Sequence, residues 1–61
     1  MTEALTKATH DVGFVETDLR AALNKASNVE ALIVLDLIKA AADLRIKTEA
    51  LLNARVADKN S

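Results

Sequence analysis

Residues 27–58 read SNVEALIVLDLIKAAADLRIKTEALLNARVAD and carry the clearest structural pattern of this chain. Its apolar residues recur at steps of three and four, the spacing of side chains on one side of an α-helix. They form two stripes that point about 160° apart, since each residue turns a helix by about 100°. The first stripe is Val34, Leu37, Ala41, Leu44, Thr48 and Leu51, widened by Ile33, Ile38, Leu52 and Val56. The second stripe is Leu32, Leu35, Lys39, Ala42 and Ile46.

A helix that is apolar on two nearly opposite sides needs cover on both, because apolar surface gains free energy when it leaves water. One stripe can pack against another helix of the same chain. The other stripe then predicts a second subunit or a partner protein.

The first half of the chain has one apolar seam, again with steps of three and four. This N-terminal seam is Leu5, Ala8, Val12, Val15, Leu19, Ala22 and Ala26. Continued past residue 26, the same steps reach Asp36, Asp43 and Lys47, so the apolar register ends there.

A helix-start signal lies at the point where the register ends. Ser27 and Glu30 have the spacing of a capping box, in which each side chain accepts a hydrogen bond from the other residue's backbone amide. We therefore predict an all-α, two-helix antiparallel hairpin in a single domain, 1–61. Its helices should span about 2–26 and about 28–58, with a turn at 27–28 and the N-terminal seam packed on the first stripe. One continuous bent helix is the alternative.

The size of the chain favours self-association. A 61-residue chain buries a marginal core unless disulfides, a metal or further subunits are added. It has no Cys and a single His, which excludes disulfides and most structural zinc sites. We expect no metal and no cofactor. Of the three ways to stabilise a small core, oligomerisation is the one that is left.

Charge and hydropathy argue against nucleic acid and membranes as partners. The net charge is −1, from eight basic and nine acidic residues spread along the chain, so no basic cluster predicts general nucleic-acid binding. No apolar run approaches the roughly 20 residues that cross a bilayer, and the first residues lack the features of a signal peptide. We expect a cytoplasmic protein without a membrane partner.

The simplest assembly is a homodimer in which two hairpins form a four-helix bundle about a two-fold axis. With the first stripe used inside the hairpin, the second stripe is left for the dimer or for a partner. Phe14, which lies opposite the N-terminal seam, is a further contact. The predicted interface residues are Leu32, Leu35, Lys39, Ala42, Ile46 and Phe14.

The sequence contains no pattern of a catalytic site. His10 lies on the outer side of its helix without a nucleophile or carboxylate facing it, and the acidic residues are spread over solvated faces. We predict a non-enzyme without catalytic residues. Surface ion pairs are expected at Glu3–Lys7, Glu16–Arg20 and Asp43–Lys47.

Gly13 is the only glycine and has three interpretations. It is a tolerated weak point, a place where another backbone approaches closely, or a kink.

The exposed Phe14 with flanking lysines on a short dimeric hairpin is similar to the plasmid regulator Rop. That resemblance implies binding of paired RNA loops by the outer face of the first helix. The residues concerned here are Lys7, His10, Phe14 and Lys25.

Our main hypothesis is a small protein-binding regulator or inhibitor that uses its apolar helix faces. Small helical proteins without cysteine are often encoded by phages or mobile elements, which suggests such an origin here. An RNA-binding regulator is the second hypothesis, and a purely structural bundle subunit is the third.

Overall fold

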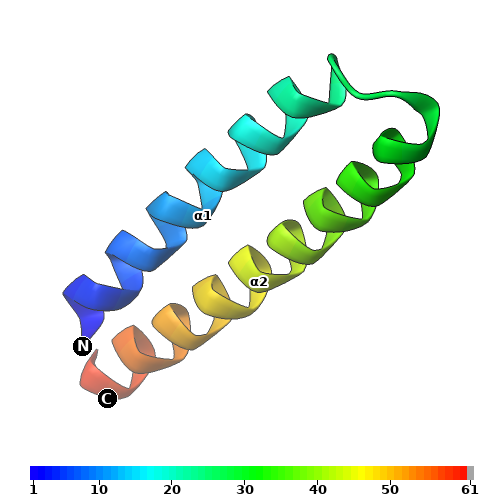
Figure 1. Ribbon diagram of the computed structural model, residues 1–61. Coiled ribbons are helices and arrows are strands. Elements are labelled where there is room, and N and C mark those ends of the chain that lie inside the picture. The colour runs from blue at the N-terminus through cyan, green and yellow to red at the C-terminus, as the bar shows by residue number, and fades with distance from the viewer. Residues whose placement is uncertain (61) are drawn as a thin grey trace.

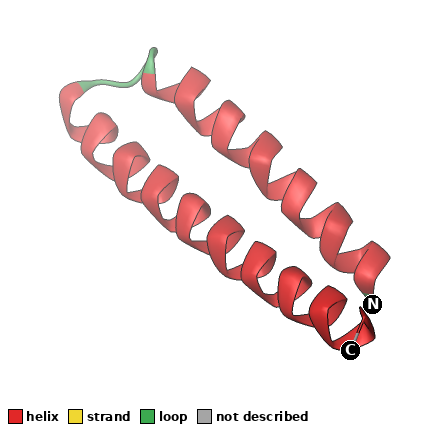
Figure 2. Cartoon of the chain, turned by 180° about the vertical axis from the view of Figure 1, so that it is seen from behind, coloured by secondary structure: helices red, strands yellow, loops and turns green. Residues whose placement is uncertain are grey.

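The computed structural model describes residues 1–60 and shows two antiparallel α-helices in contact. Helix α1 spans Thr2–Leu23 and helix α2 spans Asn28–Asn60, and residues 1–60 contain no strand. The N-terminus lies beside the end of α2 (Figure 1), and residues 24–27 form the connection at the other end (Figure 2). The predicted all-α helical hairpin is confirmed, and the continuous bent helix is wrong.

The hairpin is elongated, with extents of 50 × 14 × 12 Å and a radius of gyration of 14.5 Å. A compact domain of the same length would have a radius of gyration of about 10.5 Å. Two helices side by side leave most of their side chains at the surface.

The capping box forms as predicted. The Ser27 amide donates a hydrogen bond to Glu30 Oε1 at 2.9 Å, and the Glu30 amide donates one to Ser27 Oγ at 3.3 Å. The bond from the Ser27 amide, followed by the interaction with the Ser27 hydroxyl, lowers the pKa of the Glu30 carboxyl. Helix α2 consequently begins at Asn28.

Helix α1 ends at Leu23, three residues before the predicted end. The amides of Lys25 and Ala26 donate to the carbonyls of Ala22 and Leu23, at 3.0 and 3.2 Å. These are three-residue steps, which tighten the last turn and use carbonyls that an ideal α-helix would leave unpaired.

The line of contact between the helices differs in part from the predicted one. Five residues of the N-terminal seam are half-buried as predicted, namely Leu5, Ala8, Val12, Leu19 and Ala26, whereas Val15 and Ala22 are exposed. Thr9, Glu16 and Leu23 are also among the less exposed positions. In α2 the less exposed positions that step along the helix are Ala31, Val34, Ile38, Ala41, Arg45, Thr48 and Leu52. Among residues 1–58, Ala41 is the one buried apolar residue.

The prediction that α1 covers the first stripe is therefore wrong in part. Part of the stripe is covered: Ala41 is buried, and four residues are half-buried, namely Val34, Ile38, Thr48 and Leu52. The large residues of that stripe stay accessible, at 47% for Leu37, 55% for Leu44 and 45% for Leu51. Helix α1 lies between the two stripes, because a single helix covers only the part of α2 that faces it directly.

An ion pair joins the helices in the middle of their contact. Arg45 Nε donates to Glu16 Oε1 at 2.6 Å, and Arg45 Nη1 donates to Glu49 Oε1 at 3.3 Å. Glu16 is buried, with 6% of its surface exposed. These bonds, with Glu16 the larger contributor, raise the pKa of Arg45. The expected Glu16–Arg20 pair and the solvated position of Glu16 are thus replaced by a pair between helices.

Two further surface pairs are formed. Lys47 Nζ lies 3.0 Å from Asp43 Oδ2, as predicted. Lys7 Nζ lies 2.7 Å from Asp11 Oδ2, so Lys7 pairs with the carboxylate one turn after it instead of Glu3 one turn before it. The bond to Asp11 raises the pKa of Lys7.

Helix α1 continues through Gly13 without interruption, so the kink interpretation is wrong. A methyl group at Gly13 would meet no atom within 4 Å. No backbone within the described chain approaches this glycine closely.

Candidate functional site

The second stripe forms an accessible apolar surface on α2. Leu32, Leu35 and Ile46 are 70%, 50% and 57% exposed, Lys39 is exposed, and Ala42 is half-buried. We call these five residues the α2 outer surface. Four of the five, all except Ala42, are exposed on one side of the helix.

Acidic groups border the α2 outer surface. A shallow hollow of about 610 Å³ lies among Ala42, Ile46, Lys39, Ala40, Asp36 and Asp43. Asp43 is engaged with Lys47 on the same helix. A ligand of this surface would meet apolar side chains and the Lys39 side chain in the centre and carboxylates at the edge.

The remaining large residues of the first stripe lie on the other flank of α2. Leu37, Leu44 and Leu51 of α2 share one face of the hairpin with Ala8, Val15 and Ala22 of α1, because both sets are turned to the same side of the helix contact. We call these six residues the alanine–leucine face. Ala8 is half-buried and the other five are exposed.

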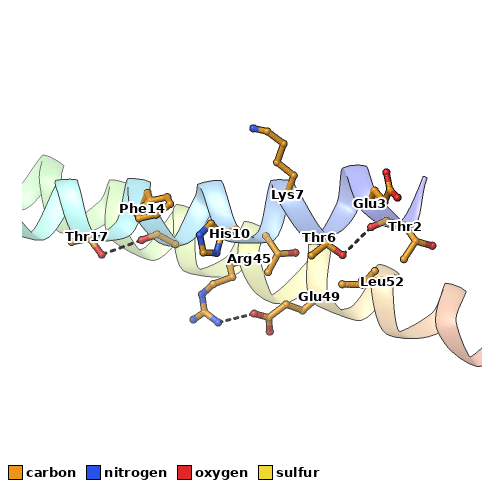
Figure 3. Close-up of a pocket in the computed structure, with 12 residues that line it drawn as sticks. Thr2, Glu3, Thr6, Lys7, His10, Phe14, Thr17, Arg45, Glu49 and Leu52 are labelled. Atoms are coloured by element: carbon orange, nitrogen blue, oxygen red, sulfur yellow. Dashed lines mark hydrogen bonds and ion pairs between the residues drawn. The ribbon is translucent and has the colours of Figure 1, made fainter.

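A groove lies between the helices on the opposite face of the hairpin (Figure 3). It has a volume of about 860 Å³ and is lined by residues of α1 and by Arg45, Glu49 and Leu52 of α2. The hydroxyls of Thr6 and Thr17 donate to the carbonyls of Thr2 and Gly13, at 2.9 and 3.1 Å. These polar groups of the groove are already used within the helix.

Phe14 lies at this groove and is 59% exposed. Its ring meets the ring of His10 edge to face, with the ring centres 4.8 Å apart and the planes at 87°. The prediction that Phe14 lies opposite the N-terminal seam and remains exposed is confirmed. It does not lie with the α2 outer surface, so the six predicted interface residues occupy two separate regions.

The four residues of the Rop-like set are only partly brought together. Lys7, His10 and Phe14 line the groove, although the Lys7 ammonium extends away from α2 (Figure 3). Lys25 lies in the connection after α1. The charge of Lys7 is shared with Asp11, which reduces its availability to a phosphate.

Within residues 1–60 there is no group of three or more His, Cys, Asp or Glu side chains placed to hold a metal ion. In that part of the chain neither helix has the length and apolarity needed to cross a bilayer.

The Glu16–Arg45 pair is the feature that sequence reasoning missed. A signal was present, since Glu16 lies four residues after Val12 and three before Leu19, and Arg45 lies at the same steps between Ala41 and Thr48. Charged residues at such positions of two facing helices can pair across the contact. Comparison of the chain with protein-family models, with curated proteins and with solved structures gave no match.

Proposed function

We propose that the protein is a non-enzymatic regulator that forms a homodimer and binds another protein through the α2 outer surface. The observation that supports the proposal most is the exposure of Leu32, Leu35 and Ile46 on one side of α2. Scattered exposed leucines are ordinary, but a contiguous apolar surface with a polar border is typical of a protein interface.

The mode of binding that fits this surface is a helix face laid against an apolar groove or a second helix. Leu32, Leu35, Lys39, Ala42 and Ile46 supply anchors at steps of three and four, as in helix-in-groove recognition. The Lys39 stem can lie on apolar surface while its ammonium reaches water. The neighbouring carboxylates of Asp36 and Asp43 favour a partner with basic side chains around its groove.

A capture experiment with matched variants tests this proposal. Immobilised wild-type protein, Ile46→Lys and the control Ala21→Lys are incubated with host lysate and washed at high salt. Ala21→Lys adds the same charge at an exposed position of α1. We expect one or more proteins to bind the wild type and the control at high salt, and to be lost with Ile46→Lys. Identical captures by all three proteins would contradict the proposal.

RNA binding is the second candidate, favoured by the exposed Phe14 beside His10. Binding of this kind should weaken steeply with salt and depend on Lys7 and Lys25. The test is the affinity for a labelled RNA hairpin pair, measured by fluorescence anisotropy at low and high salt. Salt-sensitive binding lost in a Phe14→Ala variant would favour this function, and absence of binding would leave protein binding as the better proposal.

A purely structural bundle subunit is the third candidate. It differs from the first in one outcome: the homodimer forms, but no captured protein depends on Ile46.

A further inference from the structure

The N-terminal seam and the first stripe of α2 do not point straight at each other, although part of each lies in the helix contact. Taking about 100° per residue, each seam is turned about 50° from the line of contact between α1 and α2. Both are turned toward the alanine–leucine face, away from the Phe14 groove. Val15 on α1 and Leu44 on α2 show the effect, since both belong to predicted seams and both remain exposed.

A rotation of this size has a simple geometric meaning. Two helices that pack only on each other direct their seams straight at one another. A helix at one corner of a four-helix bundle contacts two neighbours roughly at right angles, so its seam points about 45° between them. The rotation of both helices about their own axes therefore fits a bundle with two more helices on the alanine–leucine face.

The heights of the side chains agree with this arrangement. The Glu16–Arg45 contact fixes the register, so residue i of α1 lies near residue 61 − i of α2. The alanine–leucine face is then a series of layers seven residues apart, each with one smaller and one larger side chain. The pairs are Ala8 with Leu51, Val15 with Leu44, and Ala22 with Leu37, and within each pair the two residues are offset by two positions, about 3 Å along the helix axis. Two copies would place two smaller and two larger residues in each layer, an alternation that fills a core efficiently.

The accessible surface area of the single hairpin is also larger than that of a compact monomer of the same mass. The chain has an accessible surface of 4742 Å², whereas a compact monomer of 6.5 kDa has about 3,800 Å². The excess is about 900 Å², close to the roughly 800 Å² that each partner buries in a standard interface.

We infer that a second copy of this chain covers the alanine–leucine face. The inference is drawn from the rotation of the two helices, the pairing of smaller with larger side chains on that face, and the excess accessible area. The inference rests on the homodimer of the proposed function and assigns it to a different surface from the one predicted by sequence. The α2 outer surface and the Phe14 groove then stay free in the dimer, so that self-association and target binding do not compete.

Single thiols test the assignment, because the natural chain has no Cys. Ala22→Cys places a thiol on the alanine–leucine face, and Ala21→Cys places one on the neighbouring outer position; both alanines are exposed in the single hairpin. The rate of reaction with a maleimide is measured for each variant over a wide range of protein concentration, with the mass followed by sedimentation equilibrium.

We expect the thiol at position 22 to react about tenfold more slowly once the dimer is populated, while the thiol at position 21 is unaffected. Equal rates at every concentration would overturn the inference. A dimer that protects a thiol in Ile46→Cys instead would also overturn it, although the homodimer itself would stand.

Charge substitutions separate this inference from the proposed target binding. Leu44→Lys should abolish the dimer, whereas Ile46→Lys should keep the dimer mass and lose only the captured protein. A dimeric Leu44→Lys would contradict the assigned face. If Leu44→Lys does not fold, the thiol rates still decide the question.

Discussion

Arg45 on α2 holds Glu16 on α1 through a 2.6 Å hydrogen bond in the middle of the helix contact. Glu16 is nearly inaccessible, and the Arg45 side chain is about one-third exposed, at 35%. A charged pair within an apolar contact specifies register, at some cost in stability.

Removal of one partner of this pair should destabilise the hairpin. Glu16→Ala leaves the Arg45 guanidinium beside an apolar contact, and we expect the melting temperature to fall by roughly 5–10 °C. Replacement of both residues by Leu should restore much of that loss, because apolar packing takes the place of the pair. Circular dichroism melts of the two variants check this, and a double variant less stable than Glu16→Ala would contradict it.

The capping box makes a separate prediction for Ser27. Ser27→Ala removes the acceptor for the Glu30 amide and should lower the free energy of unfolding by about 1 kcal/mol. Urea denaturation measures the change. Thr6→Ala is a suitable control, since the Thr6 hydroxyl only donates to a carbonyl within its own helix. Equal stability of Ser27→Ala and the wild type would show that the box is not formed in solution.

Glu30 should make stability depend on acid pH. Its pKa is lowered in the folded chain, so the folded state binds a proton less readily than the unfolded state. The contribution is therefore present above the ordinary value of 4.5 and is lost as the pH falls through the lowered pKa. Unfolding measured from neutral to acid pH should show a smaller acid loss in Glu30→Gln than in the wild type. Parallel curves would contradict the predicted linkage.

Gly13 offers a stabilising substitution. A methyl group there meets no atom within 4 Å, and alanine favours the helix, so Gly13→Ala should raise the free energy of unfolding by about 0.5–1 kcal/mol. Thermal or urea denaturation measures it. Destabilisation by Gly13→Ala would instead indicate that a second backbone packs against this glycine in the assembled protein.

The sequence was sufficient to predict the hairpin and its connection, because both depend on local signals. The Ser27–Glu30 spacing and the end of the apolar register coincide, and the structure contains the corresponding bonds. The two stripes of α2 were also identified correctly as apolar surfaces.

The rotation of the helices was not predictable in the same way. Apolar periodicity gives the average direction in which a helix is buried by all its neighbours, and in this hairpin only one neighbour is present. Val15 and Leu44 therefore remain exposed in the hairpin, although the apolar pattern predicts them in the helix contact. Glu16 was expected on a solvated face and no role was predicted for Arg45, yet the two side chains pair across the contact. Phe14 was placed correctly, because its position opposite the seam follows from helix geometry alone.

We propose that this hairpin has too much accessible apolar surface to remain a single chain. The decisive experiment is sedimentation equilibrium of the wild-type protein over a range of concentrations. We expect a folded species of about 13 kDa, twice the 6.5 kDa of one chain. A folded, helical species of 6.5 kDa at every concentration would contradict it.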